Sequence, residues 1–221
     1  MIRDAVLALR QSFSAPFRLI LLKVVGLALL LLVVLGVSLQ ALAVRLIDFS
    51  NHRYDMVAEV LAGAGILIAV IFLVPPVVSL VGGFFQDAVA ERVELSNYPQ
   101  DPVGTEMPTM QSLLLAIRFA LLVLGVNIAA LFLIWVPGIN VVVWWVANGY
   151  LLGREYFDFA AMRHLTPPQA RALRERHPAR VFIGGLLIAL FMAIPILNLA
   201  TPLVASAFMV HVYKRLAPRP A

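Results

Sequence analysis

The most constraining feature of this sequence is an apolar run from Phe17 to Ile47, which is 31 residues long and consists mostly of leucine, valine and alanine. As an α-helix the run would extend about 46 Å, whereas the hydrocarbon core of a bilayer is about 30 Å thick. The whole chain has the same character, because 62% of its 221 residues are hydrophobic and 13% are charged, against about a quarter charged in soluble domains. We therefore expect a single membrane domain over residues 1–221.

A cleavable signal peptide is the alternative for this first run, since basic residues precede it and it contains the small-residue pattern Ala41-Leu42-Ala43. The run is about twice as long as the apolar region of a signal peptide, and the chain that follows is itself apolar. A retained spanning helix over 17–47 is therefore favoured.

Two further helices are expected around this span. Residues 1–14 repeat apolar side chains at helical spacing with polar ones on the other side, which predicts an amphipathic helix on the membrane surface. Residues 56–85 predict a second spanning helix, kinked at Pro75-Pro76 and merging into a helix that ends between Gln86 and Glu94.

Two later apolar regions, 112–152 and 181–213, are interrupted by Pro-x-x-Asn, first at Pro137 and Asn140 and then at Pro195 and Asn198. Proline removes a backbone donor, and hydrocarbon cannot satisfy an asparagine amide. Arms of 12, 14 and 16 residues reach only roughly 18, 21 and 24 Å. This favours two partially inserted, re-entrant hairpins, whose tips face protein or a water-filled path. The alternative is one kinked, tilted helix per region.

The expected fold class is thus an all-α integral membrane protein with two long transmembrane helices, two re-entrant helical hairpins and amphipathic surface helices. One surface helix, over 166–177, is basic and opens with Thr166-Pro167-Pro168-Gln169, the pattern of a capping box with proline at the first helical position.

The positive charges give the expected orientation. Arginines concentrate in 153–180 and in the tail, whereas the turn at 48–55 contains only Arg53. The positive-inside rule then places both termini in the cytoplasm. Because the basic residues flank apolar segments, we expect lipid headgroups, not nucleic acid, as their partners.

Several classes of function are not expected. The chain has no cysteine, and its four histidines have no second histidine or carboxylate at ligand spacing, so we expect no metal. No nucleophile and base pair appears at useful spacing, and no carboxylate or histidine falls in mid-membrane. We therefore expect no catalysis and no cofactor, and no proton relay built from buried acids.

Arg18 and Lys23, in the first turns of the first spanning helix, are candidate anion-binding residues. A helix N-terminus offers free N–H groups and a positive dipole end, so an arginine there would complete a site for a tetrahedral oxyanion. The alternative, which these residues alone favour, is that both side chains reach lipid phosphates.

Arg154 and Glu155 are candidates for a cytoplasmic mouth that attracts anions. The alternative, again somewhat favoured, is an exposed turn in which Arg154 pairs with Asp158 four residues on.

The stretch from Asn148 to Phe157, Asn-Gly-Tyr-Leu-Leu-Gly-Arg-Glu-Tyr-Phe, the two Pro-x-x-Asn tips and the basic segment before the last hairpin resemble the CysZ sulfate permease family, which is grouped with the etoposide-induced membrane proteins of eukaryotes. The resemblance covers nearly the whole chain. It implies a bacterial inner-membrane protein that admits sulfate for cysteine synthesis and assembles as a homo-oligomer.

In that family a Gly-Leu-Arg-like motif at the head of the first long helix is tied to sulfate. The corresponding stretch here is Pro16-Phe17-Arg18, so the resemblance points to Phe17 and Arg18 as anion-binding residues, although only the arginine matches. The proline also removes one amide donor. A non-transporting membrane scaffold that binds a partner is the alternative function, which the grouping with eukaryotic proteins suggests.

Overall fold

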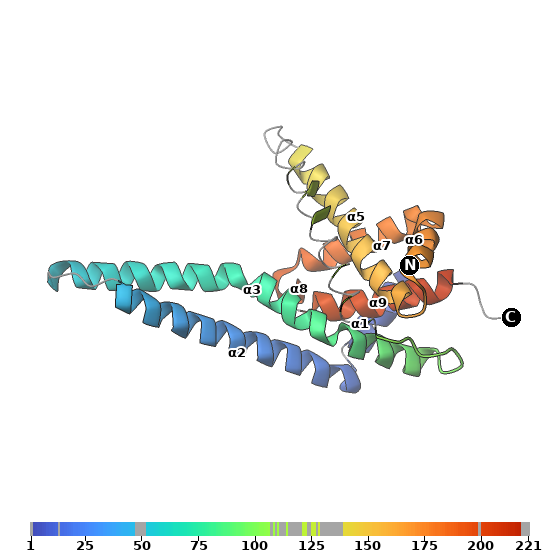
Figure 1. Ribbon diagram of the computed structural model, residues 1–221, viewed down its shortest axis with the longest axis horizontal. Helices are drawn as coiled ribbons and strands as arrows, with labels where there is room; N and C mark the ends of the chain where they lie inside the picture. Colours follow the sequence, from blue (N-terminus) through green and yellow to red (C-terminus); the bar gives the residue numbers. More distant parts are fainter. Residues whose placement is uncertain are drawn as a thin grey trace.

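In the computed structural model the chain is described at residues 2–12, 14–46, 52–106, 108, 110, 114, 121–122, 125–126, 128, 139–198 and 200–217. Regular structure in these ranges is α-helical: α1 (Ile2–Ser12), α2 (Ala15–Leu46), α3 (His52–Asn97), α5 (Ile139–Met162), α6 (Pro167–Arg176), α7 (Pro178–Met192), α8 (Pro195–Asn198) and α9 (Thr201–Leu216). Figure 1 shows α2 and α3 side by side in a long arm, with the other helices gathered in a lobe at one end of it.

Helix α2 buries one stripe of its surface and exposes the rest. The stripe consists of Phe17, Val24, Ala28 and Leu32, spaced by seven, four and four residues, as helical periodicity requires. The remaining surface is mostly apolar, and its most exposed large hydrophobic side chains are Leu19 (64%), Leu22 (66%), Val33 (61%) and Val37 (65%). Residues Phe17–Leu42 are long and apolar enough to cross a membrane, and the described residues contain no other such helix.

Helix α3 is one continuous helix of 46 residues, about 69 Å long. It runs through Pro75-Pro76, where prolines remove hydrogen bonds and bend a helix, and Figure 1 shows α3 bending before it reaches the lobe. The predicted helix over 56–85 and the segment after it therefore merge as expected. The helix begins at His52, inside the turn expected at 48–55, and continues to Asn97.

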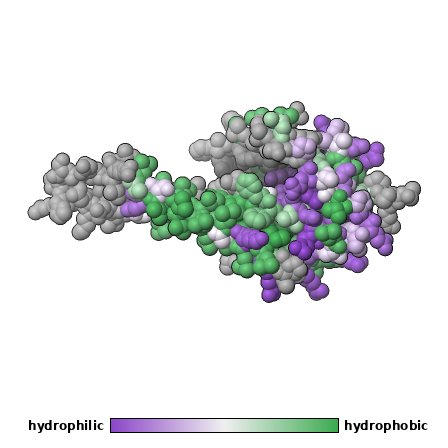
Figure 2. Space-filling view, turned by 60° about the horizontal axis from the view of Figure 1, so that its bottom comes forward, coloured by the Kyte–Doolittle hydropathy of each residue, from purple (hydrophilic) through white to green (hydrophobic). Residues whose placement is uncertain are grey.

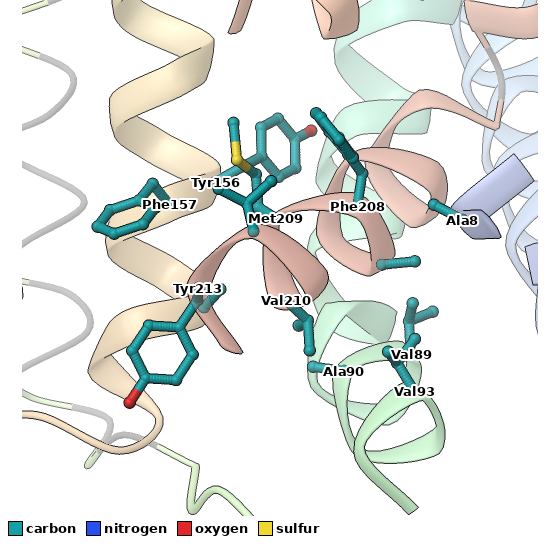
Figure 3. Close-up of a cluster of buried hydrophobic side chains, with 14 of the residues drawn as sticks. Ala8, Val89, Ala90, Val93, Tyr156, Phe157, Phe208, Met209, Val210 and Tyr213 are labelled. Atoms are coloured by element: carbon teal, nitrogen blue, oxygen red, sulfur yellow. The ribbon is translucent and has the colours of Figure 1, made fainter. Parts of the chain in front are cut away.

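Helix α9 is the centre of the lobe. All of its residues from Thr201 to Tyr213 are buried, and it contacts α1, α3, α5 and α7. Figure 3 shows Phe208, Met209 and Val210 of α9 between side chains of α1, α3 and α5. Its polar residues Thr201, Ser206 and His211 are buried together with its apolar ones, so neighbouring helices cover α9 on all sides.

The chain turns back between α7 and α9, so these two helices form a hairpin whose tip is α8 (Figure 1). We expected the backbone at this tip to need protein or water as a partner, and two of its amides are satisfied by short turns instead. The amide of Asn198 donates to the carbonyl of Ile194 (2.9 Å), and that of Ala200 donates to Leu197 (2.9 Å). Proline and asparagine therefore shape a compact turn without leaving these two donors open.

Helices α5 and α7 cross at glycines. A Cβ atom added to Gly185 of α7 would overlap the carbonyl oxygen of Gly149, and one added to Gly153 of α5 would lie 2.5 Å from the carbonyl oxygen of Val181. The absence of side chains lets the two backbones touch, which is how small residues bring helices together.

Helix α1 packs differently from the expected surface helix. Asp4 and Ala8 are buried, and Gln11 bonds to α3 and α9, whereas Val6 is 43% exposed. Two polar residues of α1 therefore face the protein, because Arg215 pairs with Asp4 (2.6 Å) and His211 meets Gln11 (3.2 Å), whereas Arg3 and Arg10 are exposed.

The predicted capping box of the basic helix is confirmed in part. The amide of Thr166 donates to Oε1 of Gln169 (2.9 Å), the hydroxyl of Thr166 donates to the same oxygen (2.8 Å), and α6 follows from Pro167 to Arg176. The helix buries Ala170 and Leu173, and its last turn contains the basic residues Arg174 and Arg176.

The α5–α7 crossing gives a first prediction. Gly185→Ala should destabilise the protein by about 1–3 kcal/mol, because the added methyl group must force the two backbones apart, and thermal unfolding in detergent measures this. Gly26→Ala is the control, since nothing lies within 4 Å of its added Cβ and alanine is favoured over glycine in a helix. An unchanged melting temperature for Gly185→Ala would contradict the close crossing.

Candidate functional site

The head of α2 follows directly from α1 through a tight turn. The amides of Phe17 and Arg18 both donate to the carbonyl of Ser14, at 3.1 and 3.0 Å, and the Ser14 hydroxyl donates to the carbonyl of Gln11 (2.6 Å). Pro16 has no N–H to offer. The Arg18 bond is the ordinary first i→i−4 bond of the helix. Among the earlier amides, which a helix N-terminus can present to an anion, that of Phe17 is bonded to Ser14 and that of Ser14 donates to the carbonyl of Gln11 (2.9 Å).

The structure does not bring the three predicted anion-binding residues together. Phe17 is 2% exposed and anchors α2 in the hydrophobic core, whereas Arg18 and Lys23 are exposed. Five residues along a helix correspond to about 140° of rotation and about 7.5 Å of rise. Arg18 and Lys23 therefore point in different directions, and Arg18 lies nearer the boundary between arm and lobe.

The predicted mouth residues lie in a helix and not in a turn. Helix α5 continues to Met162, ten residues beyond the expected end of the hairpin. Within it Arg154 pairs with Asp158 (3.6 Å), as the spacing predicted, and Arg174 of α6 binds the same carboxylate (2.9 Å). Glu155 is half-buried, and burial raises its pKa to about 7, so the carboxyl is only partly charged at neutral pH.

The residues predicted at the hairpin tips are described in part. Pro137 lies outside the described residues, and Asn140 lies in the first turn of α5. Pro195 and Asn198 begin and end α8, at the turn between α7 and α9, and Asn198 is half-buried.

A buried polar cluster that the sequence did not reveal lies at the lobe end of α3. We call it the Glu94 cluster: Glu94 and Asp87 of α3, Gly104 of the following loop, and Arg163 and His164 after α5. The Glu94 carboxylate accepts bonds from the Gly104 amide (2.9 Å), from Nη2 (3.1 Å) and Nε (3.3 Å) of Arg163, and from Nε2 of His164 (2.9 Å) if that nitrogen carries the proton. Arg163 also pairs with Asp87.

The donors of this cluster outweigh the cost of burial. Burial raises the pKa of Glu94, but the bonds from His164, Arg163 and the Gly104 amide together lower it by a larger amount, so that the pKa falls to about 2. Glu94 and Arg163 are 1% and 4% exposed. The carboxylate is therefore charged at neutral pH although it lies inside the protein.

The same end of the lobe contains further pairs between distant segments. Lys214 of α9 binds Asp101 (3.2 Å), the ring of His164 stacks on Tyr213 with centroids 5.2 Å apart, and Tyr98 meets Nδ1 of His211 (2.9 Å). Residues 86–106 contain five acids and one arginine, which runs against the positive charge expected on the cytoplasmic side. Ion pairs at Asp87, Glu94 and Asp101 neutralise three of these acids. In the sequence, the only sign of the Glu94 cluster was that an acidic stretch occurs together with the basic pair Arg163-His164.

Comparison with known proteins identifies the family. Residues 5–202 match the family described as sulfate transporter CysZ/etoposide-induced protein 2.4. The chain belongs to this family. The match covers α1 through the first turn of α9, so it includes the arm, the head of α2 and α5 to α8. No curated protein matches the chain.

The Glu94 cluster gives a second prediction. Glu94→Gln should destabilise the protein by about 3–5 kcal/mol at neutral pH, because it leaves Arg163 buried without its main counter-charge. The folded-state pKa lies below the ordinary value of 4.5, so the charge stabilises above pH 4.5 and this contribution is lost as the pH falls toward 2. The melting temperatures of the two proteins should therefore converge over that window.

Glu175→Gln provides the matched control. Glu175 pairs with Arg171 at 2.7 Å, but the two side chains are 55% and 72% exposed, and such surface pairs contribute about 0–1 kcal/mol. Equal losses in the two variants, or a difference that persists to pH 2, would show that the Glu94 cluster does not stabilise the lobe.

Proposed function

We propose that this protein is an inner-membrane permease for sulfate or a related oxyanion, supplying cysteine biosynthesis and acting as a homo-oligomer. Family membership over residues 5–202 is the observation that carries the proposal. In this account α2 and α3 cross the bilayer, and the two broken regions enter and leave it on the cytoplasmic side together with both termini.

The surface of the molecule supports this placement. Figure 2 shows hydrophobic residues over the described part of the arm and the adjoining side of the lobe, and hydrophilic residues gathered at the end of the lobe away from the arm. Exposed apolar faces as large as that of α2 mark membrane or protein contacts. The basic helix α6 and the pairs around Glu94 would then lie at the cytoplasmic surface.

Arg18 is the residue we assign to anion capture. It is exposed, it lies in the first turn of α2 where the helix dipole is positive, and it is the one position that matches the family motif. Arg154 is less suitable, because it shares the Asp158 carboxylate with Arg174 and Glu155 lies beside it.

A non-transporting scaffold is the second candidate, and the head of α2 favours it. The amides of Ser14 and Phe17 are bonded within the chain, and Pro16 has none, so an anion would find fewer backbone donors than a helix N-terminus usually offers. On this reading the purified protein would carry no anion flux and would instead retain a protein partner.

Sulfate uptake into proteoliposomes separates the two. The unaltered protein should admit radioactive sulfate, and Arg18→Ala should reduce the uptake rate at low sulfate by roughly tenfold or more, because a hydrogen bond to a charged group contributes about 1.5–3 kcal/mol. Lys23→Ala should have a smaller effect, since Lys23 points elsewhere.

Arg176→Ala is the control for loss of positive charge, because Arg176 is exposed on α6. Unchanged uptake in Arg18→Ala would remove Arg18 from the path. Absence of uptake by the unaltered, correctly folded protein would contradict the permease proposal and would favour the scaffold function.

A further inference from the structure

An apolar groove of about 240 Å³ opens on the lobe between three helices. Its walls include Ala5 and Leu9 of α1, Leu187 and Phe191 of α7, and Val204 and Phe208 of α9. Among the described residues that line it, Thr201 is the one with a polar side chain, and its hydroxyl lies 3.4 Å from the carbonyl of Leu197 in its own chain. The groove therefore offers contact to an apolar group and almost no hydrogen bonds.

The groove is continuous with an exposed apolar surface. Leu190 and Ile194, which line it, are 55% and 48% exposed, and Val6 on α1 is 43% exposed. An open hollow of this composition is unfavourable in water. Its occupant should therefore be apolar and should enter from the surface that the proposed membrane placement gives to lipid.

The groove is small and apolar along its whole lining. Its volume of about 240 Å³ is at the low end for a pocket that binds a small molecule. A hydrocarbon chain, which has no polar group along its length, matches this lining. Apolar side chains of a second copy are the competing occupant, and the test below distinguishes the two.

The charge on α1 selects the headgroup. Asp4 points into the protein and pairs with Arg215, whereas Arg3 and Arg10 are exposed. The outer face of α1 is thus positively charged, beside a groove that Ala5 and Leu9 line from the same helix. Basic residues on an amphipathic helix attract anionic lipids.

We propose that this groove is a binding site for one acyl chain of an anionic phospholipid, whose headgroup lies against α1. The site fixes α1 to the α7–α9 pair through a lipid that both contact. The proposal rests on the membrane placement above but not on sulfate transport.

The test uses phosphatidylglycerol with a photoreactive diazirine in one acyl chain, reconstituted with the full-length protein, and maps the adducts by mass spectrometry. We expect adducts on groove residues of α7 and α9 several-fold denser per residue than on the exposed leucines of α2. Phosphatidylcholine with the same chain should label the groove several-fold less, and equal labelling by both lipids would overturn the anionic headgroup.

Variants that fill the groove test whether the labelling depends on the groove itself. Ala205→Phe and, from the opposite wall, Ala5→Phe should each reduce groove adducts several-fold, whereas Ala41→Phe on the exposed surface of α2 should leave them unchanged. Groove labelling no denser than that on α2, or crosslinks from the groove to a second copy, would overturn the lipid site. Absence of adducts on α2 as well would instead contradict the membrane placement, so the two failures are distinguishable.

Discussion

The lobe depends on one buried carboxylate. Glu94 is 1% exposed, and a charge in that position is tolerated only when donors surround it. Its donors come from the loop at Gly104 and from Arg163-His164 after α5, so satisfying the charge requires the end of α3 to meet the end of α5. The fully buried helix α9 then packs against both, with Tyr213 stacked on His164. Polar pairing thus sets the position of the apolar core.

This arrangement separates two parts with different surfaces. The lobe has its ion pairs and basic helix α6 at one end, whereas the arm exposes an almost uniformly apolar helix α2. Arg18 lies where the two parts meet. An anion arriving from the polar end would reach this arginine before the apolar arm. The arginine gives the proposed permease a charge that attracts the anion, but the backbone around it supplies few further hydrogen-bond donors.

Local features of the fold were predictable and long-range pairs were not. The long apolar helix, the merging of the second helix through Pro75-Pro76 and the start of α6 at Thr166 all follow from patterns within a few residues. The inward face of α1 does not, because the partner that satisfies Gln11 lies 200 positions away at His211. The Glu94 cluster was missed for the same reason, and its acids looked like an exception to the charge distribution.

The central claim is that α7 and α9 enter and leave the membrane on the side where α1 lies. Because the chain has no cysteine, single substitutions at Arg3, Arg180 and Ala217 each give one thiol, which a membrane-impermeant maleimide can label in oriented vesicles. We predict that all three label from the cytoplasmic face and none from the opposite face. Labelling of Arg180→Cys and Ala217→Cys from opposite faces would contradict the account, because α7 to α9 would then cross the bilayer.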